Sequence, residues 1–241
     1  DNDITPVEDC TFLDNQASRG AGIHSDEAWG DVWVIDTLLE GNVATDRGGA
    51  IQFSENTTGT GHILNVIATN NQAAYGGAIS VFDSNSFSLA NSILDGNRAS
   101  IAGGGVYLDN TPGDVVNLTI HDNQAPAGAG FAQTDCTGVD VLNTIIADNP
   151  SGPGVTISGT APNWNYNDVW GSGGANYSGM TDPTGTGGNL SQDPNFDDPN
   201  TGDFSLLGNS PCINAGTPAL TDAVDGTRSD MGAYGGPYGG W

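Results

Sequence analysis

The chain contains no lysine at all, and its only basic residues are four arginines, Arg19, Arg47, Arg98 and Arg228. Because 29 residues are Asp or Glu, the formal net charge is −25. Proteins that bind nucleic acids or anionic membrane surfaces use clustered Lys and Arg. The sequence therefore argues against both as partners, and it favours divalent cations, solubility in salt, or both.

Long apolar runs are also missing. No stretch approaches the roughly 18 apolar residues that a membrane-spanning helix needs, so we expect no direct insertion into a membrane. The first residues show no charged and apolar regions of an export signal. We therefore expect that any such signal has been removed or lies upstream.

Cysteine is scarce, with three residues at Cys10, Cys136 and Cys212. Their wide spacing is unlike that of zinc or redox motifs. An odd number leaves at least one thiol unpaired within the chain. We expect small buried side chains with at most one disulfide.

What the chain does contain is one phrase, repeated with variations: DNQASRGAGIH, GNVATDRGGAIQ, NNQAAYGGAIS, GNRASIAGGGVY and DNQAPAGAGFA. The Asn at the second position of each phrase serves as an anchor, and Asn149 adds a sixth. Successive anchors are 27, 29, 26, 26 and 26 residues apart. A period in the twenties indicates a solenoid. We expect these corner asparagines to stack on one another; they are Asn15, Asn42, Asn71, Asn97, Asn123 and Asn149.

A second column of amides and acids lies six residues before each anchor. It is predicted to form a structural ladder at another bend, because Asn and Asp tolerate left-handed backbone and bond to nearby main chain. Its predicted members are Asp9, Asp36, Asn65, Asn91, Asn117 and Asn143, with Asn167 added from the phrase YNDVWG.

The segments between these columns are short runs of β-branched and aliphatic residues, such as VWVIDTLL, VVNLTI and VLNTII. Such runs are typical of strands, and the Gly, Asn and Asp between them are typical of turns. Identical residues in register at a fixed period predict an all-β parallel β-helix, in which each turn lies on the one before at strand spacing. We expect about seven to eight turns and a height of roughly 35 Å.

The paired phrases FLDN with GAGI, LEGN with GGAI, and LDGN with GGGV resemble a known repeat. It is the repeat of the right-handed parallel β-helix proteins of bacterial surfaces, similar to polymorphic outer-membrane proteins. Residues 1–157 are expected to form repeat turns. Residues 158–241 contain YNDVWG and GNLSQDPNFDDPNTGDFSLLGNSPCINAG, which resemble a segment that finishes such helices and covers their end. The resemblance implies export and surface attachment, but no known reaction.

Pectate lyases and polygalacturonases are also parallel β-helices, so a catalytic function is an alternative for this chain. Lyase chemistry on a uronate needs a cationic base, and the chain has no Lys. The phrases N-T-D, G-H-G and R-I-K of polygalacturonases are absent, and His24, His62 and His121 are isolated in the sequence. We therefore predict no catalytic residues.

Calcium is the one cofactor that the sequence favours. The segment DPNFDDPNTGD brings four carboxylates together within eleven residues, in a loop rich in Pro, Asn and Gly. Hard cations prefer such clustered oxygen ligands in flexible loops. The predicted ligands are Asp193, Asp197, Asp198 and Asp203, and the alternative is a solvated acidic turn.

These observations predict a secreted, non-catalytic structural or adhesive β-helix of a bacterial cell surface or extracellular matrix, stiffened by calcium. An uncovered N-terminal end favours head-to-tail self-assembly into filaments. Surface polysaccharide is the other expected partner. The alternative function is a carbohydrate-active β-helix that binds or cleaves a polysaccharide.

Overall fold

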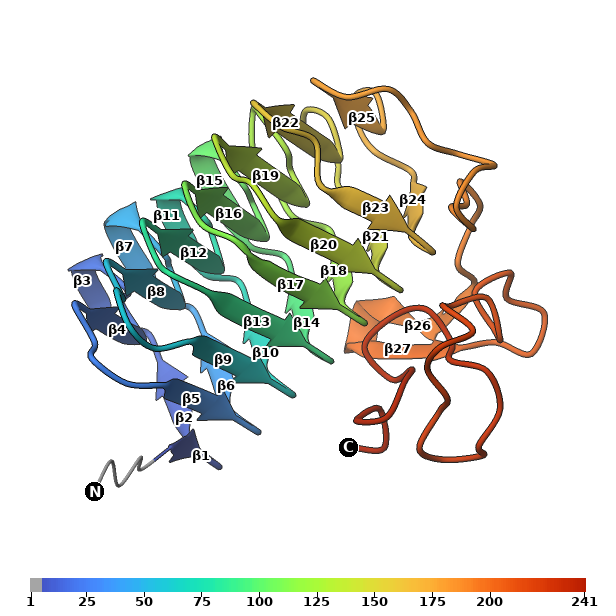
Figure 1. Ribbon diagram of the computed structural model, residues 1–241, viewed down its shortest axis with the longest axis horizontal. Coiled ribbons are helices and arrows are strands. Elements are labelled where there is room, and N and C mark those ends of the chain that lie inside the picture. The colour runs from blue at the N-terminus through green and yellow to red at the C-terminus, as the bar shows by residue number, and fades with distance from the viewer. Residues whose placement is uncertain (1–5) are drawn as a thin grey trace.

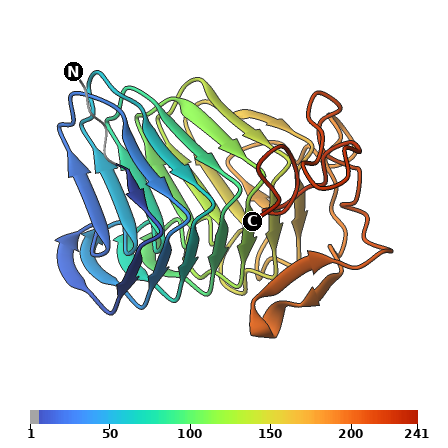
Figure 2. The same ribbon diagram turned by 90° about the horizontal axis from the view of Figure 1, so that it is seen from below.

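Three or four short strands per turn wind the chain into a parallel β-solenoid of seven turns, shown from two sides in Figures 1 and 2. The computed structural model describes residues 6–241. The all-β fold class predicted from the repeat is therefore confirmed. No helix in the described part of the chain is long and apolar enough to cross a bilayer.

Sheets A and B form two adjacent flanks and run through all seven turns. Sheet A comprises β1 (Val7–Glu8), β5 (Val32–Ile35), β9 (Gly61–Leu64), β13 (Phe87–Ala90), β17 (Gly113–Val116), β20 (Val139–Leu142) and β23 (Asn163–Asn165). Sheet B comprises β2 (Thr11–Leu13), β6 (Leu38–Glu40), β10 (Ile67–Thr69), β14 (Ile93–Asp95), β18 (Thr119–His121), β21 (Ile145–Ala147) and β24 (Asp168–Trp170).

Sheets C and D complete each turn. Sheet C covers only the first four turns, with β3 (Gln16–Arg19), β7 (Val43–Arg47), β11 (Gln72–Tyr75) and β15 (Arg98–Ala102). Sheet D comprises β4 (Ile23–Asp26), β8 (Ile51–Ser54), β12 (Ile79–Phe82), β16 (Val106–Asp109), β19 (Phe131–Thr134), β22 (Val155–Ser158) and β25 (Tyr177–Ser178).

The interior is a continuous apolar stack, because alternate residues of each strand point inward. Its largest members come from sheets A and D of successive turns, among them the fully buried Phe53, Phe87 and Phe131. At the last turns the stack ends in aromatic rings: Trp164 packs edge-on against both Phe131 and Tyr177.

The corner asparagines form a buried ladder between sheets B and C. The side-chain oxygen of Asn97 accepts hydrogen bonds from both the backbone N–H and the Nδ2 of Asn71, at 2.9 and 3.0 Å. The Nδ2 of Asn97 donates in turn to Ala68 O at 2.9 Å and to the side-chain oxygen of Asn123 at 3.0 Å. Each amide therefore satisfies main-chain groups that water cannot reach.

The second predicted column lies where sheet A meets sheet B. Its residues from Asp9 to Asn143 all have left-handed backbone, with φ between 45° and 54°. The structure corrects the last member. Because Asp168 pairs with Ile145, the residue in register with Asn143 is Tyr166, with φ 56°.

Asn167 instead occupies the next, inward-facing column of the same corner. Its side-chain oxygen accepts the backbone N–H of Thr144 at 2.9 Å, and its own N–H donates to the side-chain oxygen of Asn189 at 3.0 Å. The phrase YNDVWG offers its Asn as the member of the column, but the left-handed residue is the Tyr that precedes it.

The segment after β25 does not simply cover the end of the solenoid. Residues 187–190 follow the last turn, where Leu190 bridges to Asp168. The chain then turns back along the outer face of sheet B (Figures 1 and 2). Here it forms an antiparallel hairpin of β26 (Phe196–Asp198) and β27 (Asp203–Leu206), joined by the 3-10 turn η1 (Pro199–Thr201).

This lateral segment, residues 193–241, is anchored to several turns. Phe204 and Ala233 pack with Ile93 of sheet B, and Cys212 and Met231 pack with Ile145. Its main chain is also held by the ladder at the corner between sheets A and B. In that ladder Asn91 donates to Ala233 O and Gly235 O, at 2.9 and 2.7 Å.

Replacement of Asn97 by Ala tests the corner ladder. The change leaves the buried backbone N–H of Asn71 and the carbonyl of Ala68 without partners, and we expect it to lower the free energy of unfolding by about 3–4 kcal/mol. Urea unfolding followed by circular dichroism measures this. Asn15→Ala is the matched control, because Asn15 is the exposed first member of the same ladder. Equal effects of both substitutions would contradict the role of the buried ladder.

Candidate functional site

The outer face of sheet A carries a column of chemically distinctive side chains, one from each of turns two to seven. Aromatic residues lie in the early turns and acids and amides in the later ones. In register along the face, the column reads Trp33, His62, Ser88, Asp114, Asp140 and Asn163.

Trp33 and His62 stack face to face, with ring centroids 3.7 Å apart and planes inclined by 15°. Burial lowers the pKa of His62, while Asp31, whose Oδ2 is 4.0 Å from His62 Nε2, opposes that shift. The imidazole is therefore mainly neutral at pH 7 and presents a flat aromatic surface next to the indole.

A hollow of about 200 Å³ lies beside this stack. Trp33, His62, Leu64 and Ser88 line it from sheet A, and Tyr238 lines it from the lateral segment. Tyr238 is 58% exposed, so the hollow opens to solvent at this side. Flat rings with a few hydroxyl groups around them suit a ligand with one apolar and one polar face.

Further along the face, Asp114 and Asp140 are cross-strand neighbours. Burial raises the pKa of Asp114, and the nearby Asp140 carboxylate raises it further. Asn163 donates its Nδ2 to Asp140 Oδ1, so the last three residues of the column are linked to one another. Two neighbouring carboxyl groups at one strand spacing resemble the acid pairs of glycosidases, which are about 5–5.5 Å apart in retaining enzymes. The nearer acid, Asp114, lies three turns from Trp33, about 14 Å at ordinary strand spacing.

Two of the four predicted calcium ligands accept local backbone hydrogen bonds through their carboxylates. Asp193 Oδ1 accepts the N–H of Asn195, and Asp203 Oδ1 accepts that of Ser205, both at 2.9 Å. Asp198 faces Asp203 across the hairpin. Within residues 6–241, no three His, Cys, Asp or Glu side chains gather as a metal site. Calcium binding here stays a prediction, and the contacts seen are those of acidic turns.

His121 has acidic neighbours that the sequence did not indicate. Its Nδ1 is 2.8 Å from Asp95 Oδ1, and its Nε2 is 4.0 Å from Asp148 Oδ2. The rings of Phe196 and Phe204 cover it. This histidine therefore helps to fasten the hairpin to sheet B.

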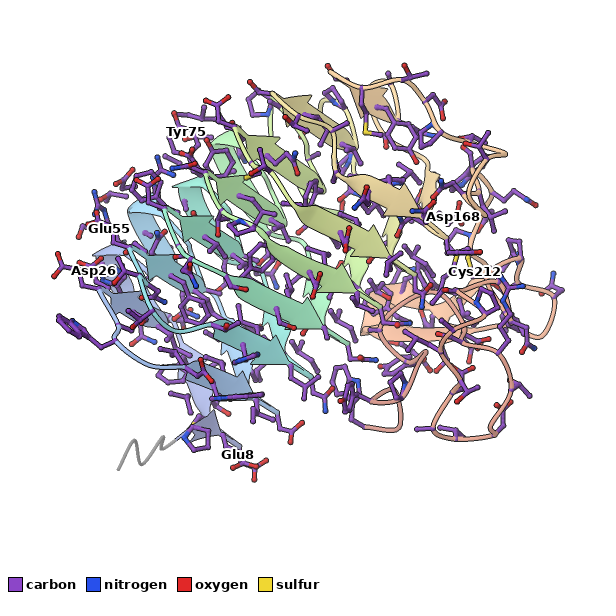
Figure 3. The ribbon with its side chains drawn as sticks, viewed as in Figure 1. Glu8, Asp26, Glu55, Tyr75, Asp168 and Cys212 are labelled. Carbon is purple, nitrogen blue, oxygen red and sulfur yellow. The ribbon has the colours of Figure 1, made fainter. Side chains whose placement is uncertain are left out.

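The most unusual carboxyl group of the molecule is Asp168, which lies fully buried between β24 and the lateral segment (Figure 3). Its Oδ1 accepts the N–H of Gln192 at 3.0 Å, and its Oδ2 accepts the thiol S–H of Cys212 at 3.3 Å. Burial raises the pKa of Asp168 to about 6, against the lowering effect of these two hydrogen bonds. Burial likewise raises the pKa of Cys212 far above its usual range.

Asp168, Asp114 and Asp140 were not among the predicted site residues. A signal for the last two was present, because they are 26 residues apart and share the repeat period. No signal links Asp168 to Cys212, which is 44 residues away and belongs to the part of the chain without a period. All three cysteines are free thiols, as expected for small buried or half-buried side chains.

Comparison of the chain with models of known protein families, with curated proteins and with solved structures finds no match to any of them.

Asp168→Asn tests the buried carboxyl group. Because folding raises its pKa, its contribution to stability is present below the unfolded value of 3.8 and is lost as pH rises through about 6. At pH 7.5 we expect the variant to be more stable by about 3 kcal/mol, and near pH 4 to equal the parent.

Urea unfolding at the two pH values measures this difference. Asp197→Asn is the control, because Asp197 is an exposed acid of the same lateral segment. A gain in stability that is the same at both pH values would contradict the assignment to ionisation.

Proposed function

We propose that this protein is a rigid, non-catalytic β-helix of a bacterial cell surface or extracellular matrix, which holds binding surfaces at fixed spacing. The buried asparagine ladder is the observation that carries the proposal. It links six successive turns through their side-chain amides, from Asn15 to Asn149. Its hydrogen bonds resist bending and local opening of the turns, which suits a spacer or adhesive element.

Two further features support this role. The lateral segment contacts turns three to seven on one side, from Ile67 to Asp168, and so joins turns that otherwise touch only their neighbours. The repeated phrases also resemble those of bacterial surface proteins, and that resemblance is the reason for proposing export and a surface location.

End-to-end assembly is part of the proposal, and the geometry restricts how it can occur. At the first turn, β1 to β4 each have only one strand neighbour among the described residues. At the other end, residues 187–190 follow the last turn: Tyr166 donates its N–H to Gly187 O at 2.9 Å, and Leu190 donates its N–H to Asn167 O at 2.8 Å. A second copy would therefore join through sheet D, or would displace these residues.

Light scattering and negative-stain imaging, with calcium and with a chelator, test assembly. We expect particles that lengthen with protein concentration in calcium and shorten in chelator, because cations screen the net charge and bridge acidic loops. Asp198→Asn with Asp203→Asn should weaken the calcium effect, whereas the exposed Asp182→Asn should not. A monomer of constant size under all conditions would refute assembly.

Saccharide binding on sheet A is the second candidate function. The stack of Trp33 on His62, the adjoining hollow and the acid pair three turns away favour it. Together they form a strip longer than one sugar ring, so the proposed ligand is an extended chain. The strongly acidic surface makes a neutral or amino-sugar polymer a better partner than a uronate.

Trp33→Ala tests this candidate against a panel of soluble neutral polysaccharides and chitosan oligomers. We expect binding to fall about five- to tenfold, since aromatic stacking supplies about 1–1.4 kcal/mol of affinity. Trp29→Ala is the matched control, because Trp29 is 86% exposed and lies outside the hollow. Equal binding by both variants would exclude the sheet A site. If the parent protein releases reducing ends from the polysaccharide and Asp140→Asn does not, the site cleaves its ligand rather than only binding it.

A further inference from the structure

Arg47, at the end of β7, lies across the outer face of sheet D among three aromatic rings. Its guanidinium carbon is 4.4 Å from the ring centroid of Phe82, 5.1 Å from that of Tyr75 and 5.5 Å from that of Tyr107. Aromatic faces attract a cation at such distances, and more strongly where water is excluded. Tyr75 is labelled in Figure 3 on the flank of the early turns.

A carboxylate completes this environment. Asp109 Oδ2 is 3.1 Å from Arg47 Nη1, and both side chains are only 18% exposed. The Tyr107 hydroxyl donates within reach of Asp109 Oδ2, at 3.4 Å, and also lies 3.3 Å from Thr134 Oγ1. We call Tyr75, Phe82, Tyr107 and Asp109 the cation cage.

The cage is built by two turns that do not include Arg47. Tyr75 and Phe82 belong to the third turn, Tyr107 and Asp109 to the fourth, and Arg47 reaches them from the second, 62 residues from Asp109. Tyr75 and Tyr107 also contact each other directly, with centroids 4.9 Å apart. Because the main chain of these turns is fixed by strand pairing and by the corner ladder, the walls of the cage keep their places without Arg47.

Two buried polar atoms lie on the same face. Ser80 is the cross-strand neighbour of both Gln52 and Tyr107, and its hydroxyl and the Gln52 Oε1 have no hydrogen-bond partner among the described residues. Buried acceptors without donors are rare in proteins. Arg47 makes one side-chain hydrogen bond here, to Asp109. A ligand with several N–H groups has donors for Asp109 and further donors for such unpartnered acceptors.

Arg19 shows that an arginine at this register position does not always lie among aromatic rings. It stands one turn earlier, in register with Arg47. Its contact is an ordinary ion pair with Asp46 at 3.0 Å, with side chains 45% and 40% exposed. Among the described residues, no aromatic ring faces the Arg19 guanidinium. Such exposed pairs contribute little to stability.

We propose that the cation cage is a binding site for an organic cation of the guanidinium class, and that Arg47 is an internal occupant which an external ligand replaces. A guanidinium group fits best because it is planar, weakly hydrated and stacks on aromatic faces, whereas an ammonium group holds its water more strongly. The net charge of −25 attracts cations to the surface. Arg47 makes one contact to Asp109 rather than a paired one, and its partly exposed side chain can swing into solvent.

The test compares binding of methylguanidinium, at low millimolar concentration, to the parent protein, Arg47→Ala and Arg19→Ala. Isothermal titration calorimetry and NMR shifts of the tyrosine rings report binding, with sodium chloride at equal ionic strength as the blank. We expect Arg47→Ala to bind at least tenfold more tightly than the parent and Arg19→Ala, since its cage has lost the internal competitor. Equal binding by all three proteins would overturn the proposal.

A second variant shows whether the rings form the site. Phe82→Ala in the Arg47→Ala background should remove the gain, and tetramethylammonium should bind less tightly than methylguanidinium because it donates no hydrogen bonds. If Arg47→Ala folds poorly, Arg47→Met keeps the aliphatic stem and its melting temperature becomes the readout. The ligand should raise it by several degrees more than it raises that of the parent, and the absence of this difference would also overturn the proposal.

Discussion

The hydrogen bond from one corner asparagine to the next is the interaction on which the rest of the structure depends. At this corner the backbone leaves sheet B, so its N–H and carbonyl groups lose their strand partners while remaining buried. An amide side chain offers one acceptor and two donors at the right reach, and Asn71 and Asn97 use all of them. Because each amide needs another exactly one turn away, the ladder fixes the register of every sheet around it.

The left-handed corners explain much of the composition. Of the 18 non-glycine residues with positive φ within residues 6–241, nine are Asp or Glu and eight are Asn. The corner between sheets C and D uses glycines such as Gly48 and Gly76. Short polar side chains tolerate this backbone, and glycine does so at the least cost. A part of the acidity is thus a consequence of how the chain turns, and the remainder is free to serve cation binding or solubility.

The columns of the repeat could be predicted because period, residue type and structure coincide there. The exception is Tyr166, which holds the left-handed position predicted for Asn167. A bulky side chain gives no hint of positive φ, whereas the neighbouring Asn matches the residue type of the column. The lateral segment could not be placed from sequence, because its contacts have no period. The segment docks through apolar contacts between residues far apart in the chain, such as Phe204 with Ile93.

The same separation between interior and surface explains where function can arise. Inward columns are bound to their neighbours above and below, so a change there disturbs several turns. Outward columns carry no such restriction, and each flank has its own chemistry: aromatic rings and acids on sheet A, the docked segment on sheet B, and caged Arg47 on sheet D. A solenoid of this kind gains a new site when two or three neighbouring turns carry outward side chains that act together. The ladder that holds the fold stays unchanged.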